Sequence, residues 1–232
     1  MASTTVANTR RSQAKSDRRS QLIAAAERLV AEKGYLAVRL EDIGAAVGIS
    51  GPAIYRHFPN KEALLVELLV GISTRLVAGA RDVLARSPDA ATALDGLIDF
   101  HLDFTLGESD LIRIQDRDLG HLPDPAKRQV RREQRQYVEI WVEVLRAAEP
   151  SIDEADARLM AHAAFGLLNS TPHSVKPVPN KAAEASSRTV LRAMTVAALA
   201  ALQAKPEFTD TPMPVRIRSC YPADHGPQSP HG

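Results

Sequence analysis

Cysteine is almost absent from the sequence, because Cys220 is the only one among 232 residues. No disulfide can form within one chain, and no metal site can be built from several thiolates. His101, His121, His162 and His173 also lack the HxxxH spacing of a helical zinc site. We therefore expect no metal, no cofactor and a cytoplasmic location.

Long hydrophobic runs are missing as well. The longest nearly unbroken apolar run, Ala193–Leu202, is about half of a membrane span. The N-terminus is polar and basic, without the apolar segment of a secretory signal. We expect a soluble protein that has no membrane partner.

Aromatic residues are few, at 4% of the chain, whereas the good helix formers Ala, Leu, Arg and Glu dominate long stretches without proline. Apolar residues make up 44% of the sequence, which is enough to fill a core. The composition predicts an all-α protein.

The net charge of +1 hides an uneven distribution. Residues 1–61 contain ten Lys and Arg against five Asp and Glu, and the remainder contains 19 against 23. A basic N-terminal module on a mildly acidic body suggests a polyanionic partner for the first part alone, although a basic solvated tail would have the same composition.

Apolar spacing and helix-ending residues divide the chain into four parts. Residues 1–16 lack periodicity and are expected to form a flexible basic arm, and a helix then runs from Asp17 to Gly34. Residues 17–60 form the first folded part, and 61–204 the second. The tail 205–232 holds six of the 15 prolines and is expected to be disordered.

The second part is predicted to contain six helices, with Asn60 capping the first. Their expected ranges are Lys61–Arg86, Pro88–Gly107, Ser109–Leu119, Ala126–Glu149, Ser151–Asn169 and Ala182–Ala204.

A helix-turn-helix is predicted within residues 40–58. Two short apolar patterns, which end and begin around Gly48-Ile49-Ser50, fit two helices joined by a tight turn. Gly48 supplies the backbone freedom for the turn, Ile49 fills the gap between the helices, and Ser50 can cap the second helix. The second helix of such a motif enters the major groove of DNA.

Ile54 and Phe58 share the inward face of this second helix, which leaves the other residues for DNA. Small groups at its start allow close approach to base edges, and side chains with donors suit phosphate oxygens. Arg56 is the one side chain here that can bind a guanine through two bonds, although it can equally be a surface charge. The candidate DNA-binding residues are Arg39, Ser50, Gly51, Pro52, Ala53, Tyr55, Arg56, His57 and Lys61.

The segment RRSQLIAAAERLVAEKGYLAVRLEDIGAAVGISGPAIYRHFPNKEALL, about residues 18–66, resembles the N-terminal module of the tetracycline-repressor (TetR) family. The resemblance implies that Tyr55, His57 and Lys61 contact phosphates and that residues 51–53 lie against base edges. At Arg39 the family often has a Thr or Ser that caps the following helix and contacts the DNA backbone. Arg39 departs from this pattern and leaves the cap open, but an arginine could still reach a phosphate. The resemblance also implies a helical C-terminal domain that binds a ligand and forms a homodimer.

A ligand cavity is expected among the helices between residues 61 and 170, and basic residues follow one face of the 126–149 helix. This arginine stripe (Arg128, Arg131, Arg132 and Arg135) is either a solvated face or an anion-binding rim for an acyl-coenzyme A. We therefore expect an apolar or acyl-type effector. The candidate lining residues are Phe100, Phe104, Leu111, Ile114, Arg131, Arg135, Trp141 and Phe165.

Small residues alternate with larger apolar ones in the last two predicted helices, which favours a two-fold four-helix bundle between two chains. The residues with this pattern are Ala161, Ala164, Phe165, Gly166, Leu168, Val190, Ala193, Met194, Ala197 and Ala201. The function favoured is therefore a homodimeric, ligand-responsive regulator, usually a repressor in this family, that binds an inverted-repeat double-stranded DNA operator.

Two other classes of protein share part of this sequence pattern. A helical enzyme would need convergent catalytic groups, and the paired carboxylates of Gln115-Asp116-Arg117-Asp118 lack a nucleophile motif, so we interpret them as a salt-bridged helix surface and expect no enzyme. A non-specific nucleic-acid-binding protein would share the basic N-terminus but would not discriminate an operator from random duplex.

Overall fold

Helices account for all regular structure in the residues that the structure describes. The computed structural model describes residues 2–170 and 181–201, and within these ranges it contains helices and no strand. The predicted fold class, an all-α protein with an N-terminal helix-turn-helix and a helical C-terminal part, is confirmed.

Three helices form the N-terminal head: α1 (Ala2–Lys33), α2 (Leu40–Ala46) and α3 (Gly51–Ile54). Directly after α1, Gly34 has a φ of 89°, and its amide donates to the carbonyl of Val30 at 2.8 Å. A left-handed residue of this kind ends a helix and favours glycine. The predicted end of the first helix is confirmed.

The start of α1 differs from the prediction. Residues 1–16 were expected to be a flexible arm with the helix beginning at Asp17, whereas α1 begins at Ala2. The stretch 2–16 contains no glycine and no proline. Nothing in it therefore ends a helix that is already nucleated by the apolar pattern further along.

The body contains the remaining elements. Wherever the structure describes a predicted helix end in the body, the observed end lies within three residues of it. The elements are α4 (Lys61–Arg86), α5 (Ala90–Gly107), α6 (Ser109–Asp118), the short 3₁₀ helix η1 (Leu119–His121), α7 (Asp124–Ala148), α8 (Glu154–Leu168) and α10 (Lys181–Ala201). The predicted proline-rich loop, residues 202–204 and the tail from Lys205 lie outside the described residues.

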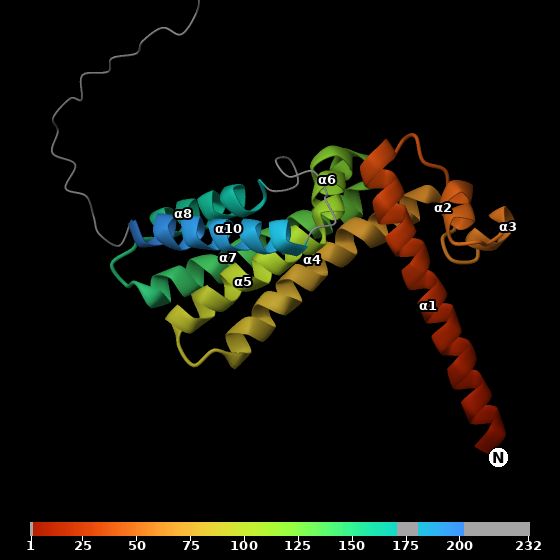
Figure 1. Ribbon diagram of the computed structural model, residues 1–232, viewed down its shortest axis with the longest axis horizontal. Coiled ribbons are helices and arrows are strands. Elements are labelled where there is room, and N and C mark those ends of the chain that lie inside the picture. Colours follow the sequence, from red (N-terminus) through yellow and green to blue (C-terminus); the bar gives the residue numbers. More distant parts are fainter. Residues whose placement is uncertain (1, 171–180, 202–232) are drawn as a thin grey trace, which may run out of the picture.

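Figure 1 shows that α2 and α3 lie at one end of the molecule and that α4 runs from there along the body. Side-chain caps start the body helices. Asn60 accepts from the amide of Ala63 at 2.7 Å, as the sequence predicted, and Asp89 does the same for Thr92 at 2.7 Å. Each cap satisfies an amide that the helix itself leaves free.

One hydrophobic cluster crosses the boundary between head and body. It contains Leu22, Ala26, Val30, Ile43, Ile54 and Phe58 from the head and Leu64, Leu65, Leu68, Leu69, Ile72, Leu111, Ile114 and Val130 from α4, α6 and α7. A second cluster, around Trp141, fills the far part of the body. The head therefore cannot move on α4 without disturbing side chains that are also part of the body.

By length and composition, α4 could cross a membrane. Its apolar residues serve a different purpose, however, because Leu64, Leu68, Leu69 and Ile72 are at most 2% exposed in the shared cluster. A buried core helix has the same composition as a membrane span. The apolar character of α4 is thus accounted for by packing.

An exposed apolar face runs along α8 and α10. Leu159, Val190 and Met194 are 68%, 53% and 50% exposed, and Gly166, Ala193 and Ala197 are exposed beside them. The predicted interface residues Ala161, Ala164 and Leu168 are instead buried within the chain. They cannot reach a partner because α8 turns that side toward its own core.

Gly79 allows α4 and α5 to approach closely. A Cβ on Gly79 would lie 2.2 Å from the Cζ of Phe100, whereas a Cβ on Gly71, in the same helix, would lie 3.6 Å from the nearest neighbouring atom, on the Arg75 side chain. The ring of Phe100 packs against the second cluster and must shift to make room for a methyl group.

We predict that Gly79→Ala lowers the free energy of unfolding by about 1–3 kcal/mol through overpacking. The control, Gly71→Ala, should raise it by up to about 1 kcal/mol because alanine favours the helix. Urea denaturation followed by circular dichroism measures both changes. Equal effects of the two substitutions would show that the Phe100 contact does not limit this position.

Candidate DNA-binding surface and ligand cavity

The turn between α2 and α3 is built as the sequence predicted. Gly48 has a φ of 71°, and the amide of Ile49 donates to the carbonyl of Gly44 at 2.9 Å. Ile49 is half-buried and packs on the shared cluster. Its Cγ1 would lie 3.3 Å from a Cβ on Gly44, so a small residue in α2 lets the turn close.

The predicted side-chain cap of α3 is absent, and the cap of α2, which the sequence left open, is made by Asp42. Arg39 is at the N-cap of α2, and the cap bond comes from Asp42, whose carboxylate accepts from the Arg39 amide at 2.9 Å. The arginine side chain has no acceptor atom, so it cannot do this itself. Ser50 is at the N-cap of α3, but its side chain makes no cap hydrogen bond.

The recognition segment, residues 50–58, exposes the side that the sequence assigned to DNA. Ile54 and Phe58 are 0% and 1% exposed, as predicted. Pro52, Tyr55 and Arg56 are exposed, while Gly51, Ala53 and His57 are half-buried. The α-helix itself is shorter than predicted, although the amide of Phe58 still donates to the carbonyl of Ile54 at 3.0 Å.

Two of the candidate phosphate contacts, Tyr55 and Lys61, already have hydrogen-bond partners within the head. The Tyr55 hydroxyl donates to Glu41 at 2.5 Å, and this bond lowers the pKa of the Glu41 carboxyl. Lys61 Nζ donates to the carbonyl of Leu36 at 3.1 Å and lies 4.4 Å from the ring centroid of Tyr35. These contacts orient both side chains at the surface and leave further hydrogen-bonding capacity on each.

His57 lies in a basic environment. Burial, followed by the charges of Arg19, Lys15 and Arg18, lowers its pKa. Its Nδ1 atom is buried and has no hydrogen-bond partner among the described residues. An anion beside His57 would accept a hydrogen bond from Nδ1 and would raise the pKa of the ring, because it would favour the protonated form.

Arg19 is a positioning residue that the sequence did not reveal. Its Nε donates to Glu67 of α4 at 2.9 Å, its Nη1 donates to the carbonyl of His57 at 2.8 Å, and its guanidinium lies 4.6 Å from the ring centroid of Phe58. One side chain thus ties α1 to α4 and to the end of the recognition segment. A lone arginine in an amphipathic helix carries no signal of such a role.

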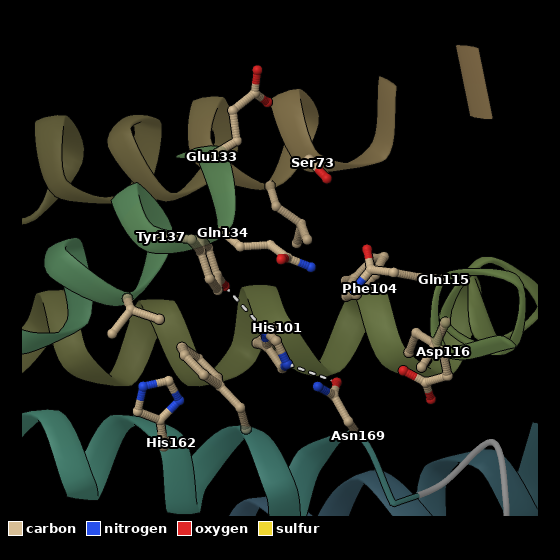
Figure 2. Close-up of a pocket in the computed structure, with 14 residues that line it drawn as sticks. Ser73, His101, Phe104, Gln115, Asp116, Glu133, Gln134, Tyr137, His162 and Asn169 are labelled. Atoms are coloured by element: carbon tan, nitrogen blue, oxygen red, sulfur yellow. Dashed lines mark hydrogen bonds between the residues drawn. The ribbon is translucent and has the colours of Figure 1, made fainter. Parts of the chain in front are cut away.

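The described part of the body contains a cavity of about 260 Å³. Figure 2 shows side chains from several helices pointing toward it. Its lining residues are Ser73, Leu76, His101, Phe104, Ile112, Gln115, Asp116, Glu133, Gln134, Tyr137, Val138, His162, Phe165 and Asn169.

Two of the predicted lining residues, Phe104 and Phe165, are among them. Leu111, Ile114 and Trp141 are fully buried core residues instead, each at most 1% exposed. Phe100 lines a separate hollow with Ile72 and Leu76. The sequence identified the right helices but could not show which side of each faces the cavity.

The arginine stripe is a solvated face. Arg128, Arg131, Arg132 and Arg135 are exposed and do not line the cavity. On α7 they lie on the side opposite Val130, Tyr137 and Trp141, which are buried. The predicted anion-binding role of Arg131 and Arg135 at the cavity is therefore wrong.

A buried chain of polar side chains crosses the cavity wall and joins three helices. His101 of α5 lies 3.0 Å from the hydroxyl of Tyr137 on α7 through Nδ1, and 3.1 Å from Oδ1 of Asn169, which ends α8, through Nε2 (Figure 2). His101 also stacks on Phe165 with 5.2 Å between ring centroids. Burial lowers the pKa of His101 to about 4, so the ring is neutral at pH 7.

The α6 segment Gln115-Asp116-Arg117-Asp118 has two roles. Gln115 and Asp116 line the cavity, which corrects their interpretation as a plain helix surface. Arg117 Nη2 donates to the carbonyl of Val30 at 2.5 Å and to the buried carboxylate of Asp118 at 2.9 Å. A cation at the last carbonyls of a helix is favourable. Consecutive residues of α6 thus touch the cavity and hold the end of α1.

Within residues 2–170 and 181–201, no group of three His, Cys, Asp or Glu side chains is arranged to hold a metal ion.

Family models match both parts of the chain. Residues 22–68 match "Bacterial regulatory proteins, tetR family", and residues 87–173 match "Tetracyclin repressor-like, C-terminal domain". The chain is 31% identical over 154 residues to the transcriptional regulator CymR of Pseudomonas putida, covering 63% of this chain and 75% of that protein. It is 29% identical over 134 residues to the transcriptional repressor KstR2 of Rhodococcus jostii, covering 57% of this chain and 66% of that protein.

Solved structures share the fold. The ketosteroid transcriptional regulator KstR2 of Mycobacterium tuberculosis has a TM-score of 0.68 and 22% identity, and the match covers 79% of this chain and 94% of that one. AibR, solved in complex with isovaleryl coenzyme A and operator DNA, has a TM-score of 0.64 and 18% identity over 76% of this chain and 97% of that one.

We predict that His101 makes the stability of the protein depend on pH. Its folded pKa of about 4 lies below the ordinary value of 6.5, so the unfolded chain binds the proton more readily between these two values. Stability from this group is complete above pH 6.5 and falls as the pH drops toward 4. From pH 7 to pH 5 the loss should be about 2 kcal/mol.

Urea denaturation at pH 7 and pH 5 measures this loss, with His101→Gln as the comparison because glutamine keeps polar atoms but does not titrate. The difference between the two proteins isolates His101 from the carboxylates, which titrate in both. An equal loss in the wild type and the variant would contradict the burial of a neutral imidazole.

Proposed function

The chain belongs to the tetR family of bacterial regulatory proteins, and we propose that it is a ligand-responsive repressor, released from an inverted-repeat operator by a small molecule. The observation that carries the proposal is the recognition segment, in which Ile54 and Phe58 are buried while Pro52, Tyr55 and Arg56 are exposed. A short helix of this kind presents its outer face to the major groove. Its site of action would be the cytoplasm.

The DNA contacts divide into two kinds. Gly51, Pro52 and Ala53 lie at the start of α3 and would approach base edges, with Arg56 as the side chain able to bind guanine through two bonds. The proposed phosphate contacts are Arg39, Ser50, Tyr55, His57 and Lys61. The free cap hydroxyl of Ser50 and the unpartnered Nδ1 of His57 support their places in this set.

The active form would be a homodimer joined through α8 and α10. Leu159, Val190 and Met194 form an exposed apolar face on these adjacent helices, and such a face usually marks an interaction site. Exposed Gly166, Ala193 and Ala197 would let two copies pack closely. A two-fold axis through this face would place two recognition segments for the two halves of an inverted repeat.

Release would begin in the cavity. Ser73 and Leu76 of α4 and Gln115 and Asp116 of α6 line it, and both helices also pack on the head. An effector that prefers the non-binding arrangement by about 2–3 kcal/mol would weaken operator affinity about 30- to 150-fold. Leu76, Phe104 and Phe165 suit the apolar part of the effector expected from the sequence, whereas the arginines assigned to an acyl-coenzyme A lie elsewhere.

Selection of duplexes from a random pool by the purified full chain tests the proposed function. We expect the enriched duplexes to contain an inverted repeat with half-sites about one helical turn apart. Binding should survive a large excess of random duplex. Enrichment of a single half-site would remove the dimeric operator from the proposal, and no enrichment at all would favour non-specific binding.

We predict different effects for two contacts in the head. Lys61→Ala should weaken binding to all duplexes alike and lower the slope of log K against log salt by about one, because it removes one phosphate contact. Arg56→Ala should cost about 1–3 kcal/mol at one base pair and relax selectivity there. Titrations of selected and mismatched duplexes at several salt concentrations measure both.

The control for both variants is Arg146→Ala, which removes the same charge from an exposed place in the last turn of α7. It should leave affinity and slope unchanged. If Lys61→Ala changes selectivity while the salt slope stays the same, the assignment of Lys61 to a phosphate is wrong.

We predict that Met194→Asp yields monomers at concentrations where the wild type is dimeric, because it places a charge in the centre of the apolar face. Leu36→Asp is the matched control, since Leu36 is 74% exposed but lies in the head. Sedimentation equilibrium measures the mass of each. A dimeric Met194→Asp protein would require the interface to be placed on other helices.

A further inference from the structure

We propose that the cavity takes a small uncharged ligand with one aromatic ring and a polar group that both donates and accepts hydrogen bonds, such as a primary amide. The proposal rests on the proposed function, in which the same cavity is the effector site. It specifies the chemistry of the effector from three features of the wall: the direction of the hydrogen bonds, the charges and the ring surfaces.

The direction of the hydrogen bonds follows from the groups involved. Oδ1 of Asn169 can only accept, so Nε2 of His101 carries the hydrogen in their bond. In a neutral imidazole Nδ1 then has a lone pair, and the hydroxyl of Tyr137 must donate to it. The only hydroxyl hydrogen of Tyr137 is therefore used within the protein.

Two hydrogen-bonding groups of the cavity wall remain available to a ligand. Tyr137 and Asn169 both line the cavity. The indole N–H of Trp141 is directed at the Tyr137 oxygen, so the second lone pair of that oxygen can accept from a ligand, while the Asn169 amide nitrogen can still donate. A primary amide complements both, because it has an N–H for the tyrosine and a carbonyl for the asparagine. A carboxylate has acceptors only and would leave the tyrosine oxygen facing another oxygen.

The charges of the lining disfavour an anion. Asp116 and Glu133 are the charged residues among the lining side chains within residues 2–170 and 181–201, and no Lys or Arg of these ranges is among them. Glu133 accepts from Thr74 at 2.7 Å and from Gln129 at 3.1 Å, so its charge is held by neutral donors. An anion would lose its hydration here without gaining a cationic partner.

The carboxylates also do not form a cation site. Figure 2 shows the Glu133 carboxylate pointing away from Gln134 and Tyr137, and this carboxylate accepts from Thr74 of α4, so the inner part of the cavity is formed by amides, a phenol and rings. Asp116 is exposed, so water screens its charge. An uncharged ligand avoids the cost of desolvation that an ammonium group would carry into this space.

Aromatic rings form the walls and limit the size. Tyr137 and Phe165 are stacked with 5.5 Å between ring centroids, and Phe104 meets the His101 ring edge to face at 5.8 Å. A volume of about 260 Å³ is slightly below the range of about 300–1,000 Å³ for ligand pockets. The space suits one ring with a short polar substituent.

Three compounds of one shape test the proposal: benzamide, benzoate and benzamidine, which are neutral, anionic and cationic at pH 7.5. Their binding to the purified full chain is measured by calorimetry and by ligand-detected NMR, without DNA. We expect benzamide to bind at least about tenfold more tightly than either charged compound. Tyr137→Phe should weaken benzamide binding about tenfold, and Asn169→Leu should do the same, with circular dichroism confirming that each variant is folded.

Arg131→Ala and Arg135→Ala are the control variants and should bind benzamide as the wild type does. Tightest binding of benzoate, or loss of binding in the arginine variants, would overturn the proposal in favour of an anion site. Tightest binding of benzamidine would overturn it in favour of the carboxylates. No binding of any compound at about 10 mM would show that the cavity does not accept such a ring.

The same compounds, added to the protein on a selected duplex, separate this proposal from the proposed function. Benzamide binding without any change in DNA affinity would leave the cavity chemistry standing and contradict release through this cavity. If the protein binds its operator but none of the three compounds, the proposed cavity chemistry is wrong and the proposed DNA binding stands.

Discussion

The structure depends on one hydrophobic cluster that the head and the body share. Side chains of α1 and of the recognition segment, such as Leu22 and Phe58, are buried in the same cluster as Leu65 and Ile72 of α4 and Ile114 of α6. Burial of an apolar side chain contributes about 1.5–3 kcal/mol, so separating the head from the body would cost several times that amount. The orientation of the recognition segment is therefore set by the helices that enclose the cavity.

Polar contacts join the head to the body in addition to this shared cluster. Arg19 ties α1 to Glu67 of α4 and to the carbonyl of His57, and Arg117 of α6 holds the last carbonyls of α1. Because Gln115 and Asp116 line the cavity immediately before Arg117, a small displacement of α6 reaches the head through a short path. Packed elements of this kind move as units, so in the proposed homodimer a ligand of modest size would change the spacing of the two recognition segments.

The sequence predicted what depends on local spacing. Ile54 and Phe58 recur at helical spacing and are buried, Gly48 adopts the left-handed conformation, and Asn60 caps α4. It could not predict the polar chain in the cavity wall, because His101, Tyr137 and Asn169 come from three helices and meet only through tertiary packing. The arginine stripe illustrates the same limit. Its spacing is that of a helix face, and only the packing of α7 decides that this face points to solvent.

The central claim is that the cavity and the DNA-reading surface are coupled through α4 and α6. Linkage makes such coupling reciprocal, so DNA must affect the cavity as the effector affects DNA. Amide hydrogen exchange of the full chain, free and bound to a selected duplex, measures this without an effector. The account predicts slower exchange on DNA binding in residues 109–118 and 61–76 as well as in 39–58. Protection confined to residues 39–58 would contradict it.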